Sequence, residues 1–513
     1  MTERDEPFLW GVSTSGYQSE GGFNGPGQPQ NNWAEGEQSG RYEKTGRASE
    51  FWTRYREDFA RCRKMGLNGF RMGIEWARVQ PATSTRRTEA APEFDFSAID
   101  AYADRIFACR AAGLEAVVTL QHFTHPAWLG TDAWLEDRTV EFFAAYVRTV
   151  VLRLNERLAG AFGAEPVRYY ITLNEPNILN QNTYLSPTFP GSHWGPAVAV
   201  RALNRLLAAH VRAYNEIHDL YEARGWRRPM VTTNTFCSDL YWSDQGILDL
   251  LSYRERGERS VESMAAREVA RLNGAIRDSE LPFREGLFVW LGRIAHRVID
   301  FLFPRYFTTE RFRFFLGVLG ASKRPRVFDY IGLDYYDPFA GHMFRPPSFG
   351  DLEFPTRSLR AWLMDGITSK WWDWRMLPEG LHFFCHYYTA LYGRPLLIAE
   401  NGMALRLKSD NAVRSARTDR TTRSEFLRSH LPMVRKLREE GCPLLGYFHW
   451  SLTDNYEWGS FTPRFGLLSL DYATGTGRLV EDYLGDRPSE TYAKLIAETE
   501  RELHTPQVSA AGQ

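Results

Sequence analysis

The chain has 513 residues, of which 43% are hydrophobic and 24% charged, proportions typical of a soluble globular protein with a large core. Its 62 Lys and Arg residues nearly balance 63 Asp and Glu residues, which argues against a nucleic-acid-binding surface or a general attraction to anionic membranes. No apolar run reaches the roughly 18 residues that would predict a transmembrane segment. Aromatic residues make up 14% of the chain, an excess that suits a core or a site for flat apolar ligands such as sugar rings.

The cysteines predict a reducing environment. They are odd in number and dispersed, without a Cys-x-x-Cys pair, which favours buried thiols over disulfides or a metal site. The five are Cys62, Cys109, Cys237, Cys385 and Cys442. The N-terminus is charged and has no apolar signal region, so we predict a cytoplasmic protein.

Strand-like and helix-like runs alternate along the chain, which predicts a parallel sheet. The predicted strands are Phe8–Val12, Gly69–Met72, Ala116–His122, Tyr169–Asn174, Met230–Asn234, Tyr330–Tyr336, Leu396–Glu400 and Leu444–Trp450. Eight such units favour one (β/α)8 TIM barrel with extended βα loops over an open doubly wound sheet, and no glycine-rich phosphate loop follows the first strand. We predict a single domain over residues 1–503 and a frayed tail over 504–513.

Three of the predicted helices have clear ends. The helical runs Glu50–Met65, Ser97–Ala112 and Ser424–Glu440 each stop before a glycine, the residue that best adopts a left-handed C-cap. Pro432 falls inside the third run, where its missing N–H predicts a kink or a break.

The longest connection between strands runs from Cys237 to Val327 and contains a charged, helix-like segment, Tyr253–Arg277. After it, in 287–307, apolar residues recur at helical spacing. They are Leu287, Leu291, Ile294, Val298, Phe301 and Leu302, with Arg293, Arg297 and Asp300 on another face. One interpretation packs this helix on the barrel. In the other interpretation, the aromatic residues of this helix extend the substrate site into an apolar surface, which would bind lipid substrates or make weak contact with a membrane. These residues are Phe288, Trp290, Phe301, Phe303 and Phe307.

Two carboxylates follow predicted strands. Glu175 comes after the fourth strand and precedes Pro176, which cannot continue a ladder, and Glu400 ends the seventh. The carboxyl ends of parallel barrel strands meet at one rim, so these two groups are expected to face each other. A protonated and an ionised carboxyl group in such a pair is what glycoside hydrolysis needs.

Other strand ends add polar and aromatic groups to the same rim. Arg71 would hold a neighbouring carboxylate ionised, His122 ends the third strand, and Asp334 and Tyr336 share one face of the sixth. Trp450 ends the eighth strand. Taken one at a time, each of these residues could have a purely structural role, as part of an ion pair, as a core histidine or in packing. Because they occur together at the carboxyl ends of the strands, they predict a site for a polyhydroxylated substrate.

Four segments, in order, resemble glycoside hydrolase family 1, the retaining β-glycosidases. The resemblance covers Phe8 to roughly Tyr492. The segments are Phe8-Leu-Trp-Gly-Val-Ser-Thr-Ser-Gly-Tyr-Gln-Ser-Glu-Gly21, Thr172-Leu-Asn-Glu-Pro176, Ile398-Ala-Glu-Asn-Gly402, and Trp450-Ser-Leu-Thr-Asp-Asn-Tyr-Glu-Trp458 followed by Arg464-Phe-Gly466.

The resemblance implies a role for each matching residue. Glu175 would be the general acid/base, Glu400 the nucleophile, and Arg71 and Tyr336 the residues that keep Glu400 charged and oriented. The substrate-binding residues would be Gln18, His122, Asn174, Trp374, Trp450, Glu457, Trp458 and Phe465. No metal or organic cofactor is implied, because the two carboxyl groups carry the proton transfer and the covalent step.

Departures from the family pattern bear on the substrate. Asp334 stands where the family usually has Asn, and its role stays open. Members acting on 6-phosphoglycosides usually have Ser in place of Glu457 and Tyr in place of Phe465, so this chain is not expected to be one of them. We predict a retaining exo-β-glycosidase of the β-glucosidase type, acting on a small-molecule β-glycoside. The second interpretation of 287–307 would make its aglycone hydrophobic, lipid or steryl. A transglycosylase on the same intermediate and a non-catalytic glycan-binding barrel are the alternatives.

Overall fold

The computed structural model of the chain describes residues 7–82, 84–282, 286–340, 371–411, 414–415, 417 and 419–504. The predicted C-terminal tail, 504–513, lies outside these residues except for His504, which ends helix α16. All five cysteines are buried free thiols.

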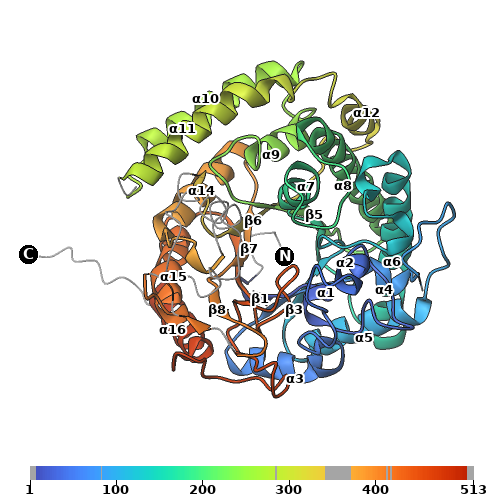
Figure 1. Cartoon of the computed structure of the whole chain (residues 1–513), viewed down its shortest axis with the longest axis vertical. Coiled ribbons are helices and arrows are strands. Elements are labelled where there is room, and N and C mark those ends of the chain that lie inside the picture. The colour runs from blue at the N-terminus through green and yellow to red at the C-terminus, as the bar shows by residue number, and fades with distance from the viewer. Residues whose placement is uncertain are drawn as a thin grey trace, which may run out of the picture.

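Eight parallel strands form a closed barrel in the order β1-β10-β7-β6-β5-β4-β3-β2, which confirms the predicted fold class (Figure 1). The bounds are β1 Leu9–Ser13, β2 Gly69–Gly73, β3 Glu115–Thr119, β4 Tyr169–Asn174, β5 Met230–Phe236, β6 Ile331–Tyr335, β7 Leu396–Asn401 and β10 Leu444–Trp450. Every predicted strand is present, with ends that differ by at most a few residues. Strand β7 is buried along its whole length, as a strand covered on both faces requires.

The strand register aligns the polar residues at the carboxyl ends. Asn174 of β4 lies opposite Asn234 of β5, and Asp334 of β6 lies opposite Glu400 of β7. Side chains from four successive strands are therefore brought to one rim.

Helices surround the barrel (Figure 1). Their bounds are α1 Gly16–Ser19, α2 Ala34–Gln38, α3 Phe51–Lys64, α4 Trp76–Val79, α5 Phe96–Ala111, α6 Asp137–Phe162, α7 Pro176–Asn180, α8 Pro196–Arg224, α9 Gln245–Ser252, α10 Val261–Asp278, α11 Leu287–Leu302, α12 Arg313–Ala321, α14 Pro378–Tyr392, α15 Arg423–Glu439 and α16 Pro488–His504. No helix in the described part of the chain is both long and apolar enough to cross a membrane.

The predicted helix ends match α3, α5 and α15. Gly66, Gly113 and Gly441 follow them in the left-handed region, with φ between 75° and 79°. Of the kink or break predicted at Pro432, the break is wrong, because α15 runs without interruption through this residue. A capping box between Thr422 and Glu425 stabilises the start of the helix, and the inner face of the helix is buried. This packing outweighs the loss of the backbone hydrogen bond that Pro432 cannot donate.

A small antiparallel sheet was not predicted. Strands β8 (Leu405–Leu407), β9 (Arg414–Ser415) and β11 (Pro463–Arg464) pair in the order β11-β8-β9. Two of them have only two residues, too few for a period-two pattern. The sheet joins the chain that follows β7 to the chain that follows β10.

Helices α10 and α11 lie outside the ring, beyond α9 and α14 in the view of Figure 1. The charged helix begins later than predicted, at α10, because Ser260 caps it by accepting a hydrogen bond from the Ser263 N–H. The predicted helix α11 is present, but its apolar face points to solvent. The exposed side chains are Leu287, Trp290, Leu291, Ile294, Val298 and Phe301, of which Phe301 is 83% exposed.

The inner face of α11 makes polar contacts. His296 lies 3.4 Å from Asp239 and 3.4 Å from Asp300, and the Trp242 indole donates to Asp300 at 2.9 Å. Phe307, by contrast, is buried against Trp242. The helix therefore packs on the barrel, as one of the two interpretations predicts, but the contacts come from residues such as His296 and Val289 and not from the exposed apolar side chains. The Phe288 side chain lies outside the described part of the structure.

Candidate active site

Glu400 is the next-to-last residue of strand β7 and is buried at the mouth of the barrel. The Arg71 guanidinium donates to its Oε1 at 2.6 Å, and the Tyr336 hydroxyl donates to Oε2 at 2.8 Å. Burial raises the pKa of Glu400 above its usual value, and the contacts with Arg71 and Tyr336 oppose that rise. Both contacts favour the ionised form of Glu400 and fix the direction in which its oxygens point.

Glu175 directly follows strand β4 and has a left-handed backbone, with φ 38°. One carboxyl oxygen from each of Glu175, Asp334 and Glu400 lies within 4.8 Å of the others. Burial raises the pKa of Glu175 well above its usual value, and repulsion by Asp334 and Glu400 raises it further. The site therefore combines Glu175, whose protonated form is favoured by burial and repulsion, with Glu400, whose ionised form is favoured by Arg71.

Asp334 is wholly buried between these two groups. Burial and the charge of Glu400 raise the pKa of Asp334, while Arg71 lowers it. The Asn234 amide hydrogen-bonds to the Asp334 carboxyl group. The substitution noted in the sequence thus places a third acidic group within the catalytic cluster.

Asn174 is fixed from three sides. Arg71 donates to its Oδ1, Asn234 donates to the same oxygen at 2.7 Å, and its own amide donates to His122 Nε2 at 3.1 Å. Burial and Arg71 lower the pKa of His122 well below its usual value, so this imidazole is neutral. Sequence reasoning missed Asn234, although its position at the end of a predicted strand was the available signal.

A second polar group lies beside the first. Gln18 donates to Glu457 Oε2 at 3.0 Å, and the Trp450 indole donates to Glu457 Oε1 at 3.0 Å. Burial raises the pKa of Glu457 to about 8, and these hydrogen bonds oppose the rise. Ser15, also missed, donates to Gln18 Oε1 at 2.7 Å and fixes that amide.

Aromatic rings connect the two polar groups. His122 stacks on both Trp450 and Trp458, with ring centroids 5.7 Å apart in each case. On the other side, Trp374 lies 5.2 Å from Tyr336 and 6.4 Å from Phe465. All twelve predicted site residues are therefore joined in one continuous set of contacts.

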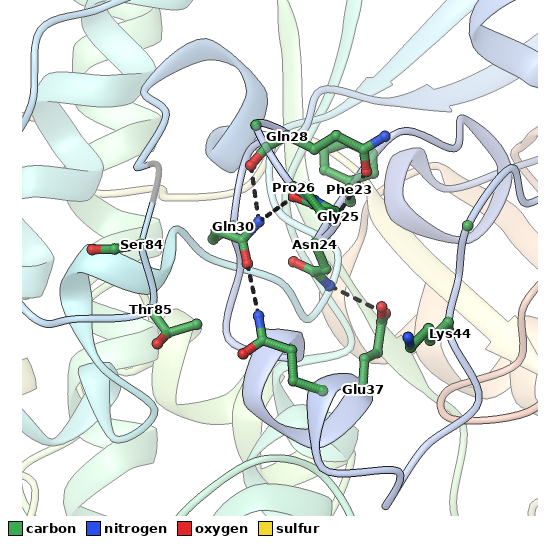
Figure 2. A pocket seen from close by; sticks show the side chains of 13 residues that line it. Phe23, Asn24, Gly25, Pro26, Gln28, Gln30, Glu37, Lys44, Ser84 and Thr85 are labelled. Atoms are coloured by element: carbon green, nitrogen blue, oxygen red, sulfur yellow. Dashed lines mark hydrogen bonds between the residues drawn. The ribbon is translucent and has the colours of Figure 1, made fainter.

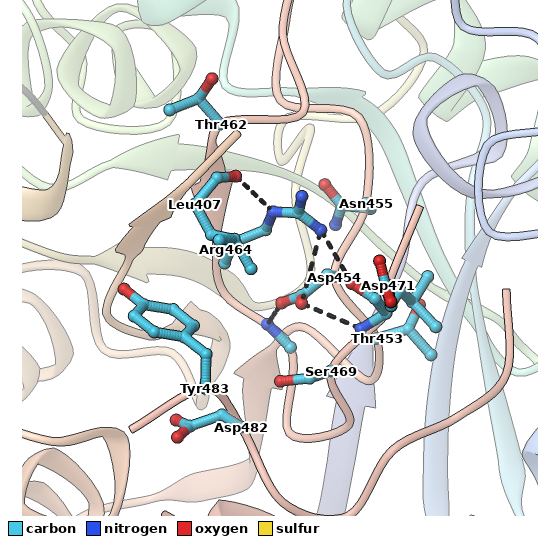
Figure 3. Close-up of polar contacts among 12 residues, drawn as sticks. Leu407, Thr453, Asp454, Asn455, Thr462, Arg464, Ser469, Asp471, Asp482 and Tyr483 are labelled. Carbon is cyan, nitrogen blue, oxygen red and sulfur yellow. Dashed lines mark hydrogen bonds and ion pairs between the residues drawn. The ribbon is translucent and has the colours of Figure 1, made fainter. Parts of the chain in front are cut away.

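The chain that follows β10 is held by buried ion pairs (Figure 3). Asp454 accepts hydrogen bonds from the Gly466 and Leu470 N–H groups at 2.9 and 3.1 Å, and lies 3.8 Å from Arg464. Arg464 donates to the Leu407 carbonyl at 2.9 Å. Asp454 therefore has a structural role: it orders the segment that carries Glu457 and Trp458.

A separate polar cavity of about 690 Å³ opens in the chain after β1 (Figure 2). Glu37 and Asn24 line it, joined by a 3.1 Å hydrogen bond. Glu37 also accepts from Tyr17, a ring neighbour of Trp458. None of the predicted site residues lines this cavity, and its polar network supports the wall behind Trp458.

A neutral and an ionised carboxyl group, surrounded by amides and indole rings at the carboxyl rim of a barrel, define a carbohydrate-cleaving TIM-barrel enzyme. The comparison with protein families agrees: the model of glycosyl hydrolase family 1 matches residues 3–233 and 325–483. The chain belongs to this family and is a glycoside hydrolase.

Curated relatives differ in their substrates. The chain is 27% identical to Beta-glucosidase A of Thermotoga maritima, covering 93% of this chain and 95% of the relative. It is 26% identical to a 6-phospho-beta-galactosidase of Clostridium acetobutylicum, covering 92% and 94%. Among solved structures, the beta-glucosidase of Thermotoga maritima in complex with azafagomine matches with a TM-score of 0.66 and 21% identity, covering 96% of this chain and 98% of that one. The family supports hydrolysis of β-glycosides by this chain, but its relatives act on different sugars, so similarity alone does not identify the sugar.

Proposed function

We propose that the protein is a retaining exo-β-glycosidase of the β-glucosidase type, with Glu400 as nucleophile and Glu175 as general acid/base. The observation that carries this proposal is the close approach of Glu175 and Glu400, since one carboxyl oxygen of each lies within 4.8 Å of the other. Retaining enzymes place the two carboxyl groups about 5–5.5 Å apart, whereas inverting enzymes need about 6.5–9.5 Å for a water molecule.

The reaction follows from the two protonation states. Glu175 gives its proton to the glycosidic oxygen while ionised Glu400 attacks the anomeric carbon, so the carbon–oxygen bond to the aglycone breaks as the bond to Glu400 forms. Water then attacks the glycosyl-enzyme, and Glu175 takes a proton from it. Asn174, fixed by Arg71 and Asn234, is proposed to bond the sugar 2-hydroxyl.

Product stereochemistry tests the mechanism. With an aryl β-glucoside, the first product seen by proton NMR should be the β-anomer, and a 2-fluoro sugar, which slows the second step, should add its glycosyl mass to Glu400. Initial release of the α-anomer would show inversion. Release of the aglycone with transfer to an added alcohol would favour the transglycosylase alternative, and no turnover at all would favour the glycan-binding barrel.

We propose that the sugar is not phosphorylated, although 6-phospho-beta-galactosidases are among the relatives. Glu457 is held by Gln18 and Trp450 in the sugar-binding group, and Phe465 offers no hydroxyl. Paired assays with an aryl β-glucoside, an aryl β-galactoside and their 6-phosphates test this. Preference for a 6-phosphate would overturn it.

We propose further that the aglycone is hydrophobic and that α11 extends its binding surface. Asp239, which follows β5, contacts His296 of α11 and accepts from the Ala340 N–H after β6, so α11 is attached to the catalytic rim. Its exposed apolar side chains would give lipid glycosides, or the membrane surface that holds them, a weak apolar contact. In a series of alkyl β-glucosides, kcat/KM should rise with chain length. A flat series would contradict the proposal. The cytoplasmic location stays a prediction.

A further inference from the structure

Three metal-binding side chains converge outside the active site, between α14 and α15. His382 and His386 are four residues apart on α14, so they lie on one face of that helix. The Nε2 atoms of these imidazoles lie 2.6 and 2.7 Å from the same oxygen, Oε2 of Glu440, the C-cap residue of α15. The three ligand atoms lie within 4.8 Å of one another.

We propose that His382, His386 and Glu440 form a site for a divalent transition metal of the zinc class. Two imidazole nitrogens and one carboxylate oxygen are a common zinc ligand set, and the metal needs each of them at about 2.0–2.2 Å. Imidazole also suits Cu²⁺, Ni²⁺ and Co²⁺, whereas Mg²⁺ and Ca²⁺ prefer oxygen. A fourth position stays open for water.

The surroundings allow an ion to enter and bind. The side chains of His382, His386 and Glu440 are 22%, 41% and 37% exposed, so solvent reaches the site without any opening of the fold. Lys436 lies 3.8 Å from the other carboxylate oxygen, Oε1, which leaves Oε2 to the histidines. The ligands come from two helices and are already placed, so binding would require only small side-chain shifts.

A metal here would link two units of the barrel. Helix α14 precedes β7, which carries Glu400, and α15 precedes β10, which carries Trp450. The ion would join the outer sides of these helices without touching the carboxyl groups at the mouth. We therefore expect metal binding to raise thermal stability and to leave the catalytic constants unchanged.

Calorimetric titration of the full chain, free of any affinity tag, with Zn²⁺ tests the site. One equivalent should bind, and Co²⁺ in its place should give the visible absorption of a four-coordinate centre. His382→Ala, His386→Ala and Glu440→Gln should each weaken Zn²⁺ binding at least about tenfold. His193→Ala is the matched control, because exposed His193 meets a single carboxylate, Asp132, at 2.6 Å.

Thermal unfolding gives a second readout. Excess Zn²⁺ should raise the Tm of the wild type and of the His193→Ala control, but not of the His382→Ala, His386→Ala double variant. Without metal, that double variant should be as active on aryl glycosides as the wild type, which shows that it is folded. The proposal is overturned if neither Zn²⁺ nor Co²⁺ binds, or if the double variant binds as tightly as the wild type; the three residues then form only a surface ion pair.

Discussion

The catalytic rim and helix α11 depart from the usual burial of residues in opposite directions. The rim buries Arg71, Glu175, Asp334 and Glu400, four groups that prefer water, whereas α11 exposes a row of apolar side chains. Burying charges is costly unless they are paired and hydrogen-bonded, and Glu400 meets this condition through Arg71 and Tyr336. An exposed apolar patch has no such internal compensation and marks a surface for contact.

The two regions also differ in whether the family model covers them. The family model matches residues 3–233 and 325–483, which include every proposed catalytic residue, but not the segment between them, where α11 lies. The family model therefore covers the rim but not α11. Four predictions test this contrast, beginning with the largest effect.

Glu400→Gln should abolish turnover. An amide is no nucleophile, so kcat on any β-glycoside should fall on the order of 10⁴-fold or more. Steady-state kinetics measure the loss, and circular dichroism checks the fold. Substantial remaining activity would mean that Glu400 is not the nucleophile.

Glu175→Gln should depend on the leaving group. Substrates whose aglycone needs protonation should slow by about 10²- to 10⁴-fold, whereas an activated nitrophenyl glycoside should be affected much less in the first step. Comparing kcat/KM over a series of aryl glycosides of differing leaving-group pKa measures this. Equal losses across the series would exclude Glu175 as the acid.

Asp334→Asn should move the pH profile. Glu175 must be protonated to act as an acid, so kcat/KM falls as pH rises through its pKa. Asp334 raises that pKa in addition to burial, so its removal lowers the pKa of Glu175 and shifts the basic limb of the profile to lower pH. Asp337→Asn, which removes a charge from the chain after β6, is the control. An unmoved basic limb would show that Asp334 does not repel Glu175.

Trp290→Ser and Phe301→Ser should have the smallest effect on the fold. Both side chains are exposed, so the free energy of unfolding should change by no more than about 0.5 kcal/mol in denaturant titrations. Turnover of a long-chain alkyl glucoside should fall while that of a small aryl glucoside stays constant. Phe96→Ser, at a similarly exposed aromatic on α5, should change neither. Equal behaviour of the three variants would exclude α11 from substrate binding.

The barrel strands were predictable because most are short runs of apolar or β-branched residues that alternate with helix-like segments. Helix ends at Gly66, Gly113 and Gly441 were predictable because a left-handed C-cap is a local requirement. Helix α15 shows the limit. Local propensity predicts a kink or a break at Pro432, but the packing of the helix's inner face, which the sequence does not display, keeps it continuous.

Within the site, residue types were predictable and their pairings were not. The sequence placed Arg71, Tyr336 and Glu400 at strand ends, and the register brought them within hydrogen-bonding distance. Asn234 was missed because one amide at a strand end is unremarkable until the neighbouring strand sets Asn174 beside it.

The sequence by itself determined the eight strands, the two carboxyl groups at their ends and the family to which the chain belongs, because these depend on local patterns. Only the tertiary structure decided three other matters: that Asp334 lies within the catalytic cluster, that His382 and His386 meet Glu440, and that the apolar face of α11 points outward. The physical reason is that helical spacing fixes which side chains share a face but not what that face meets. Distances between residues far apart in the chain are set only when the barrel closes.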